Sequence, residues 1–287
     1  MNSSIRISFV GGCHVGGYLV GLENAFSRQS SEKLNACGIK NCIDTHVVYR
    51  FRKALALEKI LNDSSPDVLV VQLGTFEAGP TILHGKFGSK KKNMSADMAD
   101  QFPYPVDATF KLNLHYKIKF LVKQAIHRLL RYRLLDDAKL QHDIECFMSA
   151  VAQLGVAHVV MLSPLPSFDP AFKVYRTRVG KMMNDAAREQ GLEITDIRTL
   201  LDGRKDLYLP DGVHLNTRGH ESLARIVAEK IKSELERTSL GEAKMKDLRQ
   251  LVGLLRRSSR HTQRNRQGQV FVEQDNLRKY SGVRQSV

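Results

Sequence analysis

The stretch PDVLVVQLG, residues 66–74, indicates the fold class. It is a nearly continuous apolar run bounded by a proline and a glycine, which is typical of a strand buried on both faces of a parallel sheet. A second run of this kind is VAHVVMLSP at 156–164, and LEITDI at 192–197 is a third. We therefore expect a sheet that is covered by helices on both of its faces.

Strands and helical patterns alternate along most of the chain. Two further strands are predicted at Ile5–Val10 and His46–Phe51. The predicted helices span residues 18–29, 52–62, 136–154, 170–190 and 217–235. This alternation indicates βαβ units, and the predicted fold class is α/β: a three-layer α/β/α sandwich with a parallel, flavodoxin-like, doubly wound sheet. Ligands of such sheets bind at the carboxyl ends of the strands, an edge formed here by 11–17, 74–79, 163–168 and 208–216.

Composition agrees with one globular domain and an appendage. The chain has 287 residues, of which 42% are hydrophobic, and no run approaches the roughly 18 apolar residues of a membrane span. The first residues lack the apolar core of a signal peptide, and the four cysteines are irregularly spaced. We expect a cytoplasmic protein with reduced thiols. Cys37 and Cys42 form a candidate metal pair without a matching second pair, so no metal and no cofactor are predicted.

The net charge of +14 is concentrated in two segments. Residues 108–135 carry seven Lys or Arg and no acid, and residues 241–287 carry eleven Lys or Arg against four Asp or Glu. The rest of the chain is formally neutral. We predict a domain over residues 1–240 with an inserted basic segment at 80–135, including a helix at 111–133.

The tail at 241–287 is predicted to begin as a basic amphipathic helix and to end in a disordered Arg- and Gln-rich stretch. Basic amphipathic helices favour anionic membranes, so the two charged segments, 108–135 and 241–287, predict a location peripheral to the inner membrane surface. Nucleic acid is the less favoured partner, because the tail has few aromatic residues.

The loop GGCHVGG, residues 11–17, follows the first strand. Its glycines match neither the phosphate-binding P-loop nor the dinucleotide fingerprint. Gly11 and Gly12 permit a tight turn that presents a nucleophile, and the dipole of the helix expected behind the loop would favour a Cys13 thiolate. A nucleophile also needs a base and an orienting carboxylate. Far along the chain, the spacing of Asp211 and His214 lets the carboxylate reach Nδ1 and leaves Nε2 for the nucleophile.

These motifs resemble those of the SGNH (GDSL-type) hydrolases. Members of that family carry G-D-S after the first strand, a glycine after the second, G-x-N-D after the third and D-x-x-H before the last helix. DGVHLNTRGHESLA at 211–224 is a close match to the last motif, and PDVLVVQLGTFE at 66–77 and VVMLSPLP at 159–166 match the surroundings of earlier ones. The resemblance covers about residues 5–235. It implies acyl chemistry on esters, with Asp211 as the orienting carboxylate and His214 as the general base.

The chain departs from the family pattern at three places. Cys13 stands where the family has its serine, and Gly38 is the candidate for the glycine of the second strand. At the third motif Phe76 replaces the asparagine that donates to the oxyanion, which typically costs about 10²–10³ in rate, although Thr75 offers a substitute donor. The predicted catalytic residues are Cys13, His214 and Asp211. The predicted oxyanion and substrate site consists of Gly12, Gly38, Gly74, Thr75, His14 and Glu77.

The expected function is that of an SGNH-like hydrolase or acyltransferase. The favoured substrate is an acyl ester, with acetyl as the acyl group, of a carbohydrate-like or lipid-like molecule. Two alternatives stay open: a catalytically silent SGNH fold that binds a glycan or a protein, and a metal site formed by Cys13, His14, Asp211 and His214. We expect His220 to pack or to cap a helix.

Overall fold

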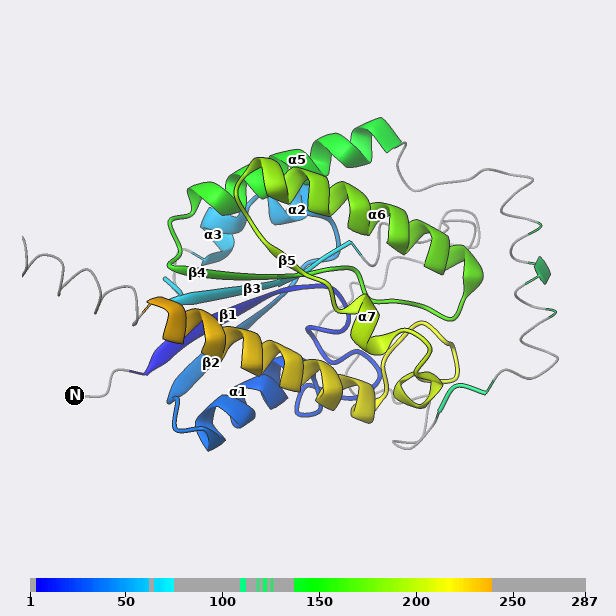
Figure 1. Cartoon of the computed structure of the whole chain (residues 1–287), viewed down its shortest axis with the longest axis horizontal. Coiled ribbons are helices and arrows are strands. Elements are labelled where there is room, and N and C mark those ends of the chain that lie inside the picture. Colours follow the sequence, from blue (N-terminus) through cyan, green and yellow to red (C-terminus); the bar gives the residue numbers. More distant parts are fainter. Residues whose placement is uncertain are drawn as a thin grey trace, which may run out of the picture. The chain divides into compact units, whose positions relative to one another are not determined.

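A five-stranded parallel sheet forms the centre of the computed structural model (Figure 1), with the strand order β2-β1-β3-β4-β5. The strands are β1 (Ile5–Gly11), β2 (Asn41–Val47), β3 (Val68–Gln72), β4 (His158–Leu162) and β5 (Ile194–Thr195). The structure describes residues 4–61, 65–74, 109–111, 118, 121–122, 125 and 137–238. Because the chain leaves β1 for β2 on one side and returns to β3 on the other, the topological switch point lies at the carboxyl end of β1, where such folds bind ligands.

Helices cover both faces of the sheet, which confirms the predicted three-layer α/β/α sandwich (Figure 1). One face carries α2 (Phe51–Ala54), α3 (Leu57–Leu61), α5 (Asp137–Gln153) and α6 (Pro170–Glu189), and the other carries α1 (Phe26–Ala36) and a helix over residues 217–238. The remaining helical elements are α7 (Arg198–Leu201) and a short 3₁₀ turn, η3 (Lys205–Leu207).

The central strand β3 is buried on both faces, as its apolar run predicts. Leu69 and Val71 lie in the core cluster that also contains Phe147 of α5 and Met183 of α6. On the opposite face Phe9 of β1 packs edge-on against Phe26 of α1, with ring centroids 5.9 Å apart. The period of two along a strand thus divides the apolar side chains between the two cores.

The helix predicted at 18–29 is wrong in its first half. The chain forms turns over residues 18–25, and α1 begins only at Phe26. Gly17, Leu19 and Gly21 all have positive φ angles, of 67°, 69° and 86°, and a right-handed helix does not contain such residues. Cys13 therefore does not precede a helix, and the predicted contribution of a helix dipole to its thiolate is also wrong.

The second strand and the helix after it are displaced from their predicted positions. β2 ends at Val47 and α2 begins at Phe51, although the β-branched and aromatic residues at 46–51 favour a strand. β2 is an edge strand whose residues are only partly buried. Its sequence, NCIDTHV, therefore lacks the apolar run by which the buried strands were predicted. The helix predicted at 52–62 is divided into α2 and α3.

Most of the basic insertion and the tail lies outside the described residues. Within the predicted helix at 111–133, residues 118, 121, 122 and 125 are helical. The chain divides into two compact units, Met1–Ser233 and Glu234–Val287, and residues 234–238 are the described part of the second. The predicted domain boundary near residue 240 stays a prediction. Among the described residues, no helix combines the length and the apolar character that crossing a membrane requires.

Gly11 packs directly on the neighbouring strand. A Cβ atom at this position would overlap the carbonyl oxygen of Gln72 and lie 2.7 Å from Cγ2 of Val15. We therefore expect Gly11→Ala to lower the free energy of unfolding by about 1–3 kcal/mol, measured by chemical denaturation. Gly12→Ala is the matched control, because a Cβ there meets only Tyr49, at 3.7 Å. Equal denaturation midpoints for the two variants would contradict this packing account.

Candidate active site

Two loops at the carboxyl ends of the strands carry Cys13, Asp211 and His214. The carboxylate of Asp211 binds its neighbour in the motif twice: Oδ2 lies 2.6 Å from Nδ1 of His214, and Oδ1 accepts the backbone N–H of His214 at 2.9 Å. Oδ1 also accepts the N–H of Val213 at 2.8 Å. A three-residue spacing within one turn is thus enough to hold the imidazole by Nδ1 and leave Nε2 for Cys13.

The electrostatics of His214 couple it to Cys13. Burial opposes the charged imidazolium, but the negative charge of Cys13 and the hydrogen bonds to Asp211 and Cys13 raise the pKa of His214 to about 10. Burial likewise opposes charge on Asp211, while the hydrogen bonds from His214 keep the pKa of this carboxyl below its usual range. Asp211 and Cys13 therefore both act on the charge of His214, which links the three side chains.

The loop that carries Cys13 is held by its own backbone. The N–H of Gly12 reaches the carbonyl of Gln72 at 3.4 Å, and the N–H of Tyr18 binds the carbonyl of Cys13 at 2.9 Å. Gly16 lies so close to β2 that a Cβ atom would approach Cγ2 of Val47 to 2.8 Å. The glycines on either side of Cys13 therefore allow the loop to lie against two strands while its half-buried thiol faces the site.

An aromatic cluster holds the opposite loop. Phe168 stacks on Phe110 and meets Tyr208 edge-on, with centroid distances of 5.1 Å in both cases. The N–H of Phe168 binds the carbonyl of Gly212 at 2.8 Å, and Gly212 has a φ of 65° with Phe110 packed where a Cβ would stand. The aromatic rings thus position the turn between Asp211 and His214.

Asn216 connects this loop to the helix that follows. Its Oδ1 accepts the N–H of Gly219 at 3.0 Å, which is an N-cap of the helix over residues 217–238. Its amide nitrogen donates to the carbonyl of Asp206 at 2.8 Å. The DGVHLN sequence therefore contains the carboxylate of Asp211, the imidazole of His214 and the N-cap of the last helix within six residues.

Two further histidines are buried beside His214. The ring centroid of His14 lies 5.4 Å from that of His214 and 5.8 Å from that of His220. Nδ1 of His220 accepts the N–H of Phe26 at 3.1 Å, so His220 caps α1 rather than its own helix. Burial, reinforced by the charge of His214, lowers the pKa values of both: to about 3 for His220 and well below the usual range for His14. Both rings are neutral.

Three residues at the site were missed by sequence reasoning. Burial and the nearby charge of Cys13 raise the pKa of Tyr18, and they raise that of Tyr49 to about 12. The ring of Tyr18 lies 5.1 Å from that of His214. Arg176 of α6 is buried, with its NH1 group donating to the carbonyls of Leu165 and Pro166 at 3.1 and 2.9 Å.

Arg176 brings a positive charge to the surroundings of Cys13. Burial lowers the pKa of its guanidinium, and the neighbouring Tyr208, Cys13 and Asp211 oppose that effect, so the group remains protonated at neutral pH. A single arginine in an otherwise ordinary amphipathic helix carries no sequence signal of burial. The two tyrosines stand in loops, without a motif of their own.

The predicted oxyanion and substrate residues are only partly brought together. Gly12 adjoins Cys13. Gly74 follows β3 with a φ of 83°, and a Cβ atom added to it would lie 3.0 Å from side-chain atoms of Pro164, Val179 and Met183. Thr75 and Glu77 lie outside the described residues.

Gly38 requires a correction. It follows α1 and precedes β2, whose first residue pairs with Ile5 at the amino ends of the strands, so it lies at the opposite edge of the sheet from Cys13. Its φ of 82° and the hydrogen bond from the N–H of Ile39 to the carbonyl of Leu34, at 2.9 Å, make it the glycine that ends α1. The predicted role at the site is wrong for this residue.

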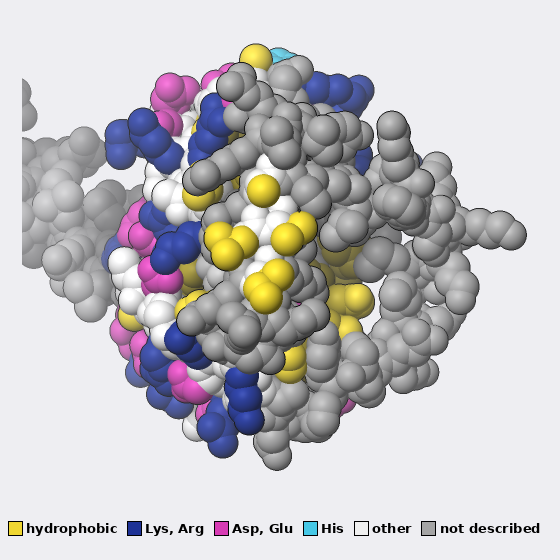
Figure 2. Space-filling model, turned by 90° about the vertical axis from the view of Figure 1, so that its right-hand side faces the viewer, with side chains coloured by type: hydrophobic (Ala, Val, Ile, Leu, Met, Phe, Trp, Pro, Cys, Tyr) yellow, Lys and Arg dark blue, Asp and Glu magenta, His cyan; other side chains and the backbone are white. Residues whose placement is uncertain are grey.

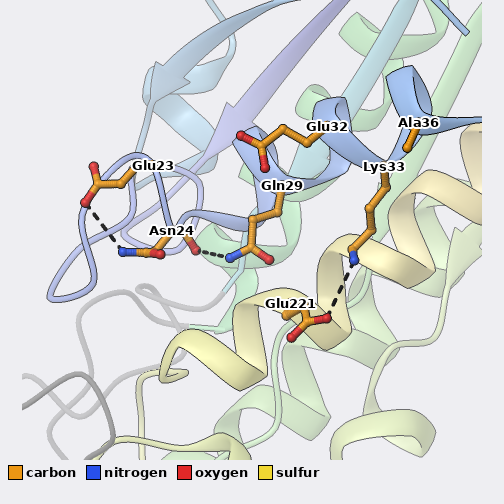
Figure 3. A pocket seen from close by; sticks show the side chains of 7 residues that line it. All are labelled: Glu23, Asn24, Gln29, Glu32, Lys33, Ala36 and Glu221. Carbon is orange, nitrogen blue, oxygen red and sulfur yellow. Dashed lines mark hydrogen bonds and ion pairs between the residues drawn. The ribbon is translucent and has the colours of Figure 1, made fainter.

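Other polar groups offer no competing site among the described residues. Within those residues no cluster of three or more His, Cys, Asp or Glu is arranged to hold a metal ion, so the alternative of a metal centre has no geometric support. A hollow beside α1 is lined by acidic and amide side chains (Figure 3), several of which bind one another. Lys33 pairs there with Glu221 at 3.7 Å. Cys13, Asp211 and His214 do not line this hollow.

Comparison with known proteins finds one relative by sequence and several solved structures with a similar fold. No protein-family model matches the chain. A stretch of 171 residues, 58% of the chain, is 26% identical to an acetylxylan esterase from Xylanibacter ruminicola. This stretch corresponds to 29% of that esterase, so the chain spans less than a third of the length of this relative.

Solved structures share the fold. The lipase/acylhydrolase from Enterococcus faecalis superposes with a TM-score of 0.50 at 15% identity, over 80% of this chain and 96% of that one. The psychrotrophic esterase EstA from Pseudoalteromonas sp. superposes with a TM-score of 0.50 at 14% identity, over 81% and 100% of the two chains. The arrangement of sheet and helices described above is therefore that of these enzymes.

Proposed function

Because the chain has the fold of the SGNH (GDSL-type) hydrolases, we propose that it is an ester hydrolase or acyltransferase with Cys13 as its nucleophile. The observation that carries the proposal is the arrangement of Asp211, His214 and Cys13, in which Asp211 holds Nδ1 of His214 at 2.6 Å and Cys13 is close enough to raise the pKa of His214. A nucleophile, a base and an orienting carboxylate are the parts that covalent acyl transfer requires.

The reaction proceeds in two steps. His214 holds the proton of Cys13, and the thiolate attacks the ester carbonyl to give a tetrahedral intermediate. His214 then donates its proton to the departing alkoxide, which leaves an acyl thioester on Cys13. In the second step His214 takes a proton from water or from an acceptor hydroxyl, which attacks the thioester and releases the acyl product while the thiol is restored.

The backbone N–H of Cys13 stabilises the oxyanion of both intermediates. None of the described residues accepts a hydrogen bond from this N–H. The neighbouring Gly12 leaves space beside it, because a Cβ atom at Gly12 would meet only the ring of Tyr49, at 3.7 Å. One preorganised donor of this kind typically contributes about 10²–10³ in rate.

Two observations support the substrate class that we propose. The similarity to an acetylxylan esterase favours an acetyl ester of a carbohydrate. The phenols of Tyr18 and Tyr49 are protonated at neutral pH, as tyrosines ordinarily are, so both can donate to the hydroxyl oxygens of a sugar. Their rings also offer an apolar surface beside the acetyl group.

Hydrolysis of p-nitrophenyl acetate and of acetylated xylan tests this function. The purified chain is expected to turn over both esters and to release acetate from the polysaccharide. A folded protein that hydrolyses neither ester would contradict the proposal and would favour a silent fold that only binds a glycan or a protein.

We also propose that the basic insertion binds anionic membranes. Ile118, Leu121 and Val122 are 53%, 64% and 51% exposed, and their spacing places them on one side of a helix. Figure 2 shows hydrophobic side chains gathered on the face that is turned to the viewer. The surrounding sequence, 108–135, carries seven basic residues and no acid, and each Lys or Arg near an anionic bilayer contributes about 1 kcal/mol.

Leu121→Asp is expected to lower the affinity for phosphatidylglycerol vesicles about tenfold, since it places a carboxylate in the apolar stripe. Sedimentation with vesicles at low and high salt measures this, and deletion of 241–287 is expected to weaken binding further. Leu200→Asp is the matched control, because Leu200 is 52% exposed outside the basic segments. Full-length protein that stays in the supernatant at low salt would show that the stripe does not bind membranes.

A further inference from the structure

His14 lies against the sulfur atom of Cys13. Its Nδ1 is 3.4 Å from Sγ, within the range of a hydrogen bond to sulfur. The ring is buried and lies beside the rings of His214 and His220. The two steps of the proposed reaction assign no task to His14.

The other nitrogen of His14 determines which tautomer is present. The backbone N–H of Leu215 points at Nε2 at 3.4 Å, and a backbone N–H can only donate. Nε2 must therefore be the unprotonated acceptor. Burial and the positive charges of His214 and Arg176 hold the ring in its neutral form, and a neutral ring with a bare Nε2 carries its proton on Nδ1.

We propose that His14 is a second catalytic imidazole, which donates a permanent hydrogen bond from Nδ1 to the Cys13 thiolate. The inference rests on the proposed function, since it concerns the same nucleophile. The sulfur then has two imidazole partners with different tasks: His214 exchanges the proton, and His14 stabilises the negative charge and fixes the direction of Sγ.

The charged surroundings explain why a neutral donor is needed. The groups that face His14 are Cys13, His214 and His220, with Arg176 close enough to act through its charge. A second protonated histidine among His214 and Arg176 would be repelled by both. A neutral donor stabilises the thiolate without adding to that repulsion, and it keeps its proton when His214 gives its own to the leaving group.

Two substitutions separate the two ends of the ring. In His14→Asn the side-chain amide stands near the position of Nδ1 and keeps a donor for the sulfur. In His14→Gln the amide stands near the position of Nε2, where it keeps an acceptor for the N–H of Leu215 but leaves the sulfur without its donor. The measured quantity is the rate of Cys13 alkylation by iodoacetamide against pH, followed by mass spectrometry of the cysteine peptides.

His14→Gln is expected to raise the midpoint of the alkylation profile by about one pH unit, the equivalent of one hydrogen bond to a charged group. His14→Asn is expected to leave the midpoint within a few tenths of a unit. Cys146 provides the internal control, because its sulfur lies 3.6 Å from Nε2 of His142 on the exposed side of α5 and is independent of His14.

The outcomes are distinguishable. A Cys13 that reacts in the wild type but keeps its midpoint in His14→Gln would overturn this inference and leave the proposed function standing. Equal shifts in both variants would assign His14 a packing role instead. A wild-type Cys13 that reacts no faster than Cys146 at any pH would overturn the proposed nucleophile, and the role of His14 with it.

Discussion

Replacement of Cys13 by alanine is expected to lower kcat for p-nitrophenyl acetate by about 10⁴-fold or more. The proposed mechanism passes through a covalent bond to Sγ, and removal of a catalytic nucleophile leaves only the rate due to binding and oxyanion stabilisation. The side chain is half-buried in a loop, so the loss of one sulfur atom should change the free energy of unfolding by about 1 kcal/mol or less. Steady-state kinetics and thermal unfolding on the same preparation measure both.

Cys146→Ala is the control for this experiment. Its thiol also lies beside an imidazole, that of His142, but on a helix of the outer layer. Unchanged kcat in Cys146→Ala and loss in Cys13→Ala would assign the chemistry to the loop. Turnover that survives in Cys13→Ala at the wild-type rate would remove the thiol from the reaction.

Substitution of Asp211 by asparagine is expected to lower kcat about 10²- to 10⁴-fold and to change its dependence on pH. In the wild type the pKa of His214 is about 10, so the imidazolium that protonates the leaving group is present below pH 10 and is lost as the pH rises through that value. The neutral amide of asparagine removes one of the charges that favour the imidazolium. The descending limb of the kcat/KM profile should therefore move to lower pH.

The raised pKa of His214 also makes the free energy of unfolding depend on pH. The pKa of His214 is raised in the folded state from an ordinary value of 6.5, so the stabilisation that it contributes is complete below about pH 6.5 and is lost as the pH rises towards 10.

Asp196→Asn supplies a matched control for the pH profile. Asp196 also has a lowered pKa, caused first by its hydrogen bond with Arg198, but it stands outside the triad. Its variant should keep the wild-type profile. A descending limb that stays in place in Asp211→Asn would contradict the role assigned to the His214 proton.

The sequence predicted contacts between residues that are close together in the chain. It did not predict contacts that form only when distant elements pack together. The D-x-x-H spacing determines the bond between Asp211 and His214 within one turn, and the apolar run of β3 determines its burial. His14 was predicted at the site from its place in the loop, but its contact with Leu215 depends on the tertiary structure. The burial of Arg176 depends on it as well, and hydrophobic periodicity contains no information on either. Gly38 shows the converse, because a glycine that ends a helix and one that adjoins a site look alike in a sequence.

The displaced start of α1 has a physical cause of the same kind. Residues 18–25 contain apolar side chains at helical spacing, but Gly17 and Gly21 adopt positive φ angles that set the path of the loop around Cys13. His220, far along the chain, then caps the helix at Phe26. The local pattern predicts a helix from residue 18, whereas the contact with His220 accompanies a start at Phe26. The tertiary contact determines where the helix begins.

Trapping the acyl group on the enzyme tests whether Cys13 is the nucleophile. A reaction with p-nitrophenyl acetate is quenched in acid during turnover, and the peptide that contains Cys13 is analysed by mass spectrometry. We expect this peptide to gain the mass of one acetyl group and the adduct to be removed by hydroxylamine, as a thioester is. Turnover that proceeds without any acetyl adduct on Cys13, or with the adduct on another residue, would contradict this role of Cys13.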